Sequence, residues 1–90
     1  MRESKIEKYL VTEVEKIGGA CIKFPPLFYA GFPDRLVFLP GGLFILVETK
    51  APRKTPSTIQ RRVHSRFRDL GFRVEVLNTI EAVDTFILTL

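Results

Sequence analysis

The sequence predicts an α/β fold in which helices flank a mixed sheet, with the element order αβββαβα. Two observations lead to this prediction. Apolar residues recur at helical spacing in three segments, and four shorter apolar runs have the length and patterning of strands. Turns rich in glycine and proline separate many of these segments, and no internal repeat is present. We therefore expect one domain that spans residues 1–90.

The N-terminal half is expected to form one helix and three strands. Apolar residues from Ile6 to Val14 share one helical face and two glycines follow, which predicts a helix over 4–17. The strands are expected at 20–24, 36–39 and 43–47. Because Pro40-Gly41-Gly42 separates the last two strands, we expect a hairpin whose second strand is buried on both faces.

The C-terminal half is expected to supply a helix, a fourth strand over 72–77 and a last helix. Thr55 before Pro56 is typical of a helix start. Asn78, with Glu81 three residues later, resembles a capping box for the last helix. The core stripe of the first of these two helices is expected to consist of Ile59, Val63, Phe67 and Leu70.

Composition excludes membrane and secreted classes. No run approaches the roughly 20 apolar residues of a membrane span, and the charged N-terminus is unlike a secretory signal. We therefore expect a cytoplasmic protein without a membrane partner. With 90 residues, the chain is near the size at which a lone hydrophobic core is marginal, so a partner subunit would stabilise it.

The residues available as metal ligands are almost all oxygen donors. Cys21 is the one cysteine and His64 the one histidine, so the chain lacks the set of about four Cys and His ligands that a zinc site needs. A catalytic metal must therefore be held by oxygen, which points to Mg²⁺ or Mn²⁺.

Positive charge is concentrated in one segment. Residues 50–73 carry eight Lys and Arg residues against one acid, Asp69, although the net charge of the whole chain is only +4. Such a block suits a polyphosphate partner, and a solvated helix face is the alternative explanation. The candidate phosphate contacts are Arg53, Lys54, Arg61, Arg62, Arg66 and Arg68, with Lys23 and Arg35 as extensions of the same surface.

The third predicted strand ends in an unusual way. Its apolar run leads directly into Glu48-Thr49-Lys50, and alternation puts Glu48 and Lys50 on one face. Burying both charges is costly unless they pair or bind an ion. An incidental ion pair is the alternative, and Glu3-Ser4-Lys5 on the first helix shows that a Glu-x-Lys match alone is weak evidence.

A second carboxylate, Asp34, precedes the first hairpin strand. Antiparallel pairing brings the start of that strand opposite the end of the next, so Asp34 is expected near Glu48. These two carboxylates and the carbonyl of Thr49 would form an oxygen cage for a divalent metal, with Lys50 positioning the nucleophile or stabilising the developing oxyanion.

With these residues, the chain resembles the virus-type replication-repair nuclease (VRR-NUC) domain of the PD-(D/E)XK superfamily over nearly its whole length. The predicted order αβββαβα is also the order of that restriction-endonuclease-like core. The motifs that carry the resemblance are an early helical glutamate, Gly31-Phe32-Pro33-Asp34-Arg35, Pro40-Gly41-Gly42, Glu48-Thr49-Lys50, Gln60 and Gly71-Phe72.

The resemblance implies Mg²⁺- or Mn²⁺-dependent cleavage of phosphodiester bonds in DNA. Asp34 and Glu48 would then be metal ligands, Lys50 would lie beside the scissile phosphate, and Gln60 would have a supporting role. Stand-alone phage members look like homodimeric Holliday-junction resolvases with a role in repair and recombination. A similar role here would place the protein in the cytoplasm of a bacterial or phage-infected host cell.

Three assignments have alternatives in the sequence. The early glutamate is Glu3 or Glu7, and helical geometry favours Glu3 because it projects closer to the centre of the apolar stripe. His64 lies one turn after Gln60, where a boundary role competes with catalysis. The aromatic loop over 24–32 is suited to stacking on unpaired bases, to filling the core or to a dimer contact.

Two other functional classes compete with the nuclease. A non-catalytic nucleic-acid-binding module would use the basic block and keep the carboxylates for structure. An interaction protein would use the aromatic loop to bind another protein. The first predicts metal-independent DNA binding, and the second predicts no salt-sensitive DNA binding.

Overall fold

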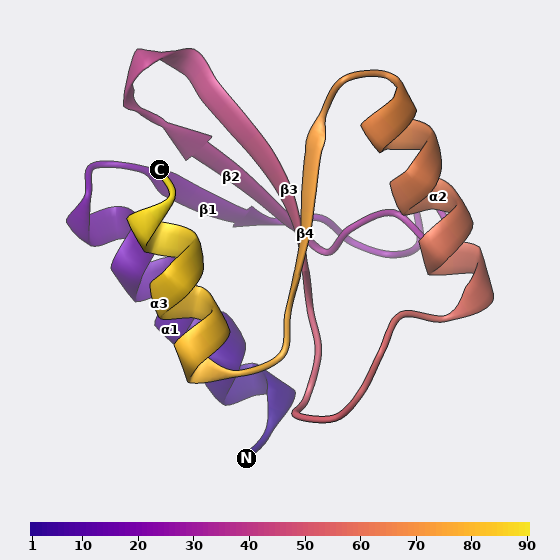
Figure 1. The fold of residues 1–90 in the computed structure, drawn as a ribbon, viewed down its shortest axis with the longest axis horizontal. Coiled ribbons are helices and arrows are strands. Elements are labelled where there is room, and N and C mark those ends of the chain that lie inside the picture. The colour runs from indigo at the N-terminus through magenta and orange to yellow at the C-terminus, as the bar shows by residue number, and fades with distance from the viewer.

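The computed structural model describes residues 1–90 and has the predicted order of elements (Figure 1). The helices are α1 (Glu3–Lys16), α2 (Thr58–Asp69) and α3 (Ile80–Leu88). The strands are β1 (Ala20–Lys23), β2 (Arg35–Leu39), β3 (Leu43–Thr49) and β4 (Arg73–Leu77), and the 3-10 turn η1 (Pro40–Gly42) joins β2 to β3. The predicted α/β class, with a mixed sheet flanked by helices, is confirmed.

The four strands form one sheet in the order β1-β2-β3-β4. The first three are antiparallel neighbours, whereas β4 pairs parallel with β3 after the chain crosses over through α2. Helices α1 and α3 lie side by side on one face of the sheet, and α2 lies on the other (Figure 1). The end of β3 therefore has a different helix on each side.

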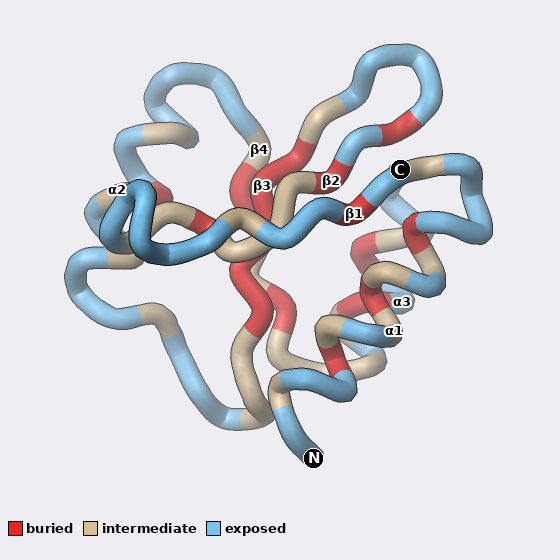
Figure 2. The backbone as a smooth tube through the Cα atoms, turned by 180° about the vertical axis from the view of Figure 1, so that it is seen from behind, coloured by how far each residue is buried: buried red, intermediate tan, exposed pale blue.

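The main core lies between the sheet and the α1–α3 pair. Ile6, Leu10 and Val14, spaced four residues apart on α1, are fully buried against Val37 and Ile45 of the sheet. Figure 2 shows the buried residues concentrated in the central strands and along α1 and α3. No helix combines the length and the apolar character that crossing a bilayer requires.

Strand β3 is buried on both faces, as predicted. Every residue from Ile45 to Thr49 is buried, whichever face it is on. The turn before it requires glycine, because Gly41 and Gly42 have φ values of 85° and 82°, which side chains with a Cβ disfavour. The turn fixes the pairing of Arg35 with Val47, and with it the register of the hairpin.

The starts of α2 and α3 differ from the sequence prediction. Ser57 caps α2 instead of Thr55, since its hydroxyl accepts a hydrogen bond from the Gln60 backbone N–H at 3.2 Å. Thr79 caps α3 in the same way, whereas Asn78 donates to the carbonyl of Lys54. Cap residues compete over short distances, so a shift of one or two positions changes which hydroxyl reaches the free N–H groups.

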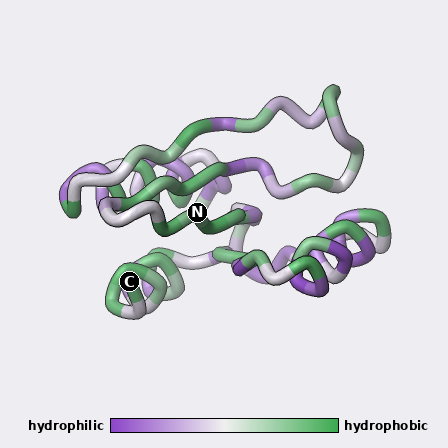
Figure 3. Tube along the Cα trace, turned by 90° about the horizontal axis from the view of Figure 1, so that it is seen from above, coloured by the Kyte–Doolittle hydropathy of each residue, from purple (hydrophilic) through white to green (hydrophobic).

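The predicted core stripe of α2 is only partly correct. Val63 and Phe67 are half-buried, but Ile59 and Leu70 are 56% and 61% exposed, and the residue that α2 buries is His64. In Figure 3, more of the tube of α2, at the right, is purple and hydrophilic than that of α3, beside the C label. Helix α2 therefore covers its face of the sheet incompletely and presents a polar residue to it.

Candidate active site

A hollow of about 310 Å³ opens where β3 ends, between α1 and the segment that precedes β2. It is walled by charged side chains from four parts of the chain and by the aromatic rings of Phe24 and Phe32. The hydrogen-bonding and charged residues that line it are Glu3, Glu7, Lys23, Asp34, Glu48, Lys50 and Gln60. Residues up to 57 positions apart in sequence therefore meet at one end of the sheet.

Strand alternation divides the end of β3 between the two faces. Glu48 and Lys50 line the hollow, and Glu48 faces α2, where it meets His64. Thr49 points the other way and contacts Glu7 of α1 and Asp34. The hollow lies where these two layers meet, so it draws side chains from both.

Three carboxylates crowd together beside the start of α1. Ligand oxygens of Glu3, Glu7 and Asp34 all lie within 4.8 Å of one another. Burial, a hydrogen bond to Glu7 and the negative charge of Asp34 raise the pKa of Glu3. This crowding favours either a bound proton or a bound cation.

Asp34 is tied to the end of β3 by two hydrogen bonds. Its Oδ1 accepts the Thr49 backbone N–H at 2.9 Å, and its Oδ2 accepts the Thr49 hydroxyl at 2.7 Å. Burial raises the pKa of Asp34 despite these bonds, and the negative charges of Glu48 and Glu7 raise it further. The carboxylate is thus oriented within a strongly negative environment.

Glu7 is the carboxylate with a cationic partner. Its Oε2 accepts a hydrogen bond from Arg35 at 3.1 Å, and both side chains are largely buried. Burial opposes ionisation, but the hydrogen bonds from Arg35 and Glu3 outweigh it and lower the pKa of Glu7. Glu7 is therefore the member of the crowded trio whose neighbours favour its ionised form.

Two known proteins are similar to this chain, one in sequence and one in structure. No protein-family model matches the chain. A protein called "Putative nuclease p44", from Acyrthosiphon pisum secondary endosymbiont phage 1, is 51% identical over 79 residues, which cover 88% of this chain and 85% of that protein. A solved structure described as a VRR_NUC domain superposes with a TM-score of 0.89 and 36% identity, over 96% of this chain and 94% of that one. The chain belongs to the VRR-NUC family.

Within this VRR-NUC fold, the hairpin brings together the carboxylates that the sequence analysis singled out. Asp34 and Glu48 line one hollow with Lys50, and Glu3 and Glu7 both line it too, so lining the hollow does not decide between these two glutamates. The densest cluster, however, is that of Asp34 with the two glutamates of α1. Helical spacing brings residues four apart to the same side of α1, which is why both reach the site.

The side chain of Thr49 points away from the hollow of the VRR-NUC site. Its hydroxyl donates to Asp34 Oδ2 at 2.7 Å and lies 3.4 Å from Glu7 Oε1. The metal-ligand role expected of the Thr49 carbonyl oxygen stays a prediction. The Thr49 side chain is fully buried on the α1 side of β3. Alternation along the strand accounts for this, because the residue between Glu48 and Lys50 must point away from them.

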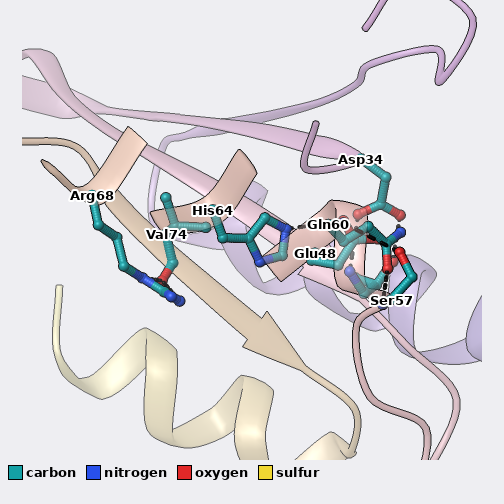
Figure 4. A network of polar contacts seen from close by, with 8 residues as sticks. Asp34, Glu48, Ser57, Gln60, His64, Arg68 and Val74 are labelled. Atoms are coloured by element: carbon teal, nitrogen blue, oxygen red, sulfur yellow. Dashed lines mark hydrogen bonds and ion pairs between the residues drawn. The ribbon is translucent and has the colours of Figure 1, made fainter. Parts of the chain in front are cut away.

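Gln60 lines the hollow, but it also begins α2. Its Oε1 accepts the backbone N–H of Ser57 at 2.9 Å, which completes a capping box with the Ser57 hydroxyl (Figure 4). The amide oxygen is therefore engaged in the fold. The amide NH₂ group remains as the hydrogen-bond donor that Gln60 can offer to the site.

The VRR-NUC chain separates its basic residues into two groups. Arg35 pairs with Glu7, and Arg68 donates from Nε and Nη2 to the Val74 carbonyl at 3.2 and 2.8 Å, so both guanidinium groups serve the fold. Strand alternation turns Arg35 towards α1, whereas Arg68 stays exposed while it joins α2 to β4, and the phosphate contacts expected of both residues stay predictions. Arg61 is exposed and donates to the Pro56 carbonyl at 2.6 Å. The remaining predicted cations, Lys23, Arg53, Lys54, Arg62 and Arg66, are exposed and have no side-chain hydrogen bond within the chain.

The aromatic loop of this VRR-NUC fold has two kinds of residue. Phe32 is half-buried and packs against Phe67 of α2 with ring centroids 5.0 Å apart, and Tyr29 contacts both rings but is 40% exposed. Leu27 and Phe28 are 94% and 77% exposed on the same loop. Phe32 therefore packs between the loop and α2 outside the main core, whereas Phe28 projects into solvent.

The sequence analysis did not anticipate one contact in this VRR-NUC site. His64 Nε2 lies 3.4 Å from Glu48 Oε1, and both side chains are almost inaccessible (Figure 4). The signal available in the sequence was the position of His64 between Val63 and Phe67 on the apolar side of α2. Cys21, by contrast, lies outside the hollow, and burial raises the pKa of its thiol to about 11.

Proposed function

We propose that this VRR-NUC protein is a Mg²⁺- or Mn²⁺-dependent endonuclease that hydrolyses phosphodiester bonds in branched or duplex DNA. The observation that carries the proposal is the hollow itself, which gathers four carboxylates and two lysines at one end of the sheet. The sequence similarity to a phage protein called "Putative nuclease p44" supports the same class of reaction.

The donor set fits a hard divalent cation. The clustered ligand atoms are all carboxylate oxygens, the kind that Mg²⁺ and Mn²⁺ prefer. Burial and the neighbouring carboxylates raise the pKa of Glu3 and Asp34, and a cation would offset the repulsion between these like charges. When bound, the cation would activate water and neutralise charge at the phosphorus. Glu3, Glu7, Asp34 and Glu48 are the residues that would hold it.

The other residues of the hollow would bind and orient the substrate. Lys50 and Lys23 bring positive charge to the hollow, where they would contact the non-bridging oxygens of the scissile phosphate. The Gln60 amide would donate a hydrogen bond to the phosphate or to the attacking water. The exposed arginines Arg61, Arg62 and Arg66 on α2 would hold the backbone of the duplex without reading its sequence.

Branched DNA is the substrate form that we propose, with a homodimer as the acting species. Leu27 and Phe28 project from a loop whose neighbouring residues line the hollow, a position suited to contact with bases that are unpaired at a branch. Two copies related by a twofold axis would present two such hollows to two strands. The alternative, a non-catalytic basic module, would bind DNA through the basic segment 50–73 and keep the carboxylates for structure.

The test is a cleavage assay on a labelled four-way junction and a matched linear duplex, with Mg²⁺, Mn²⁺ or chelator. Glu48→Gln and Lys50→Met are expected to lose at least about a hundredfold in rate, whereas Glu15→Gln, at an exposed position of α1, is the matched control and retains activity. Sedimentation of the same samples measures the oligomeric state. Cleavage that persists in Glu48→Gln would contradict the site, and metal-independent binding without cleavage would favour the basic module.

A further inference from the structure

Helix α2 buries a polar residue beside the end of β3. Of its twelve residues, His64 is the buried one, with 1% exposure, although apolar residues on both sides of it remain partly exposed. Taking an imidazole out of water without a partner costs free energy. Its burial therefore indicates a specific polar contact.

That contact is the carboxylate of Glu48. His64 Nε2 and Glu48 Oε1 are 3.4 Å apart, and neither atom is accessible to solvent or has a well-formed hydrogen bond elsewhere. A short charge-assisted hydrogen bond would measure about 2.7–2.9 Å. His64 Nε2 and Glu48 Oε1 are thus each other's nearest available hydrogen-bond partners.

The two oxygens of Glu48 have different surroundings. Oε1 is buried beside His64 and has no hydrogen-bond partner. Oε2 is not such a buried atom without a partner. Glu48 also forms part of the wall of the hollow. His64 does not line the hollow, so its ring cannot touch a substrate there. The imidazole can act on the site only through Glu48.

We propose that His64 is a positioning residue that fixes the rotamer of Glu48. Its Nε2–H holds Oε1, and Oε2 is thereby kept towards the hollow, where the divalent cation would bind. The inference rests on the proposed function. Partners that orient a ligating carboxylate typically change metal affinity by about 10- to 100-fold when they are removed.

Mn²⁺ binding in the absence of DNA, measured by calorimetry or by electron paramagnetic resonance, tests the proposal. We expect His64→Leu to weaken Mn²⁺ binding about 10- to 100-fold. His64→Gln, which places an amide N–H near the position of Nε2, is expected to restore most of the affinity. In a Glu48→Gln background, His64→Leu is expected to have no further effect, because the histidine acts through that carboxylate.

The outcomes separate this inference from the proposed function. Equal Mn²⁺ affinity in wild type and His64→Leu, with cleavage intact in wild type, would overturn the role of His64 alone. A wild-type protein that neither binds Mn²⁺ nor cleaves DNA would overturn both. Circular dichroism of each variant checks that it folds.

A measurement on the unmodified protein does not depend on the folding of any variant. The ¹⁵N chemical shifts of the His64 ring report which nitrogen carries a proton. We expect a protonated Nε2 whose chemical shift changes on addition of Mg²⁺, which is diamagnetic and does not broaden the signal. An Nε2 without a proton would overturn the proposal, because it has no hydrogen to donate to Glu48.

Discussion

The Asp34 carboxylate accepts two hydrogen bonds from one residue, Thr49, through the backbone N–H at 2.9 Å and the hydroxyl at 2.7 Å. The pair joins the residue that precedes β2 to the last residue of β3. It fixes the direction of a carboxylate that burial and neighbouring acids would otherwise favour in the protonated form. Several consequences of this arrangement can be measured.

Thr49→Val keeps the shape of the side chain and removes the hydroxyl. We expect a loss of stability of about 1 kcal/mol, since Asp34 Oδ2 loses a hydrogen bond. The pKa of Asp34 should rise further, because that hydrogen bond now lowers it. Urea unfolding and carboxyl NMR titration measure the two effects. Thr12→Val, at an exposed position of α1, is the control, and an equal effect there would contradict the assignment.

Without metal, ionisation of the crowded acids should reduce stability as pH rises. The folded-state pKa values of Glu3 and Asp34 are raised, so their protonated forms stabilise the fold below the ordinary carboxyl pKa, and this contribution is lost as pH rises through the raised values. Glu7, whose pKa is lowered, contributes in the opposite direction.

Glu3→Gln removes one of the two carboxyl groups whose ionisation is expected to lower stability as pH rises. The variant is expected to unfold at a higher urea concentration than wild type at neutral pH in chelator, and the difference should shrink at pH values below the ordinary carboxyl pKa. Added Mg²⁺ should stabilise wild type more than the variant. A gain that is independent of pH would show that charge repulsion is not its cause.

Gly31→Ala should be strongly destabilising. Gly31 has a φ of 83°, and an added Cβ would lie 2.6 Å from Ile59 Cγ2 and 3.0 Å from the Ile59 carbonyl oxygen. Strain and overpacking together predict a loss of about 2–4 kcal/mol. Gly41→Ala has a similar φ but no atom within 4 Å, so it should lose only about 1–2 kcal/mol in the same unfolding measurement. Equal losses would contradict the packing of the loop on α2.

The exposed and the engaged arginines should behave differently in DNA binding. Arg62 and Arg66 are exposed and form no ion pair within the chain, so the double variant to alanine should reduce the slope of log K against log salt by about 2 without loss of stability. Arg68→Ala should lower stability by about 1 kcal/mol, because it releases the Val74 carbonyl. An unchanged slope in the double variant would remove α2 from the DNA interface.

Phe28→Ala tests whether the exposed tip of the aromatic loop contacts branched DNA. We expect the rate on a four-way junction to fall several-fold more than the rate on a linear duplex, because stacking on an unpaired base is worth about 1–3 kcal/mol. Leu88→Ala changes an equally exposed apolar residue at the end of α3 and should leave both rates unchanged. Equal losses on the two substrates would argue against a role in branch recognition.

Much of the fold could be predicted from local patterns. The element order followed from patterns that involve only a few neighbouring residues. These patterns are the spacing of apolar residues on α1, the continuous apolar run of β3 and the glycines of η1. The caps of α2 and α3 were wrong by one or two residues, because several hydroxyl and amide side chains compete for the same N–H groups.

The sequence by itself determined that Asp34, Glu48 and Lys50 would approach one another, because a tight hairpin and strand alternation leave few other arrangements. Tertiary structure decided what surrounds them. Packing of α1 brings Glu3 and Glu7 beside Asp34. Arg35 forms an ion pair with Glu7, because both side chains lie between α1 and the sheet. The position of α2 across the sheet pairs His64 with Glu48. Such contacts depend on how distant elements dock, which the periodicity within any one element does not encode.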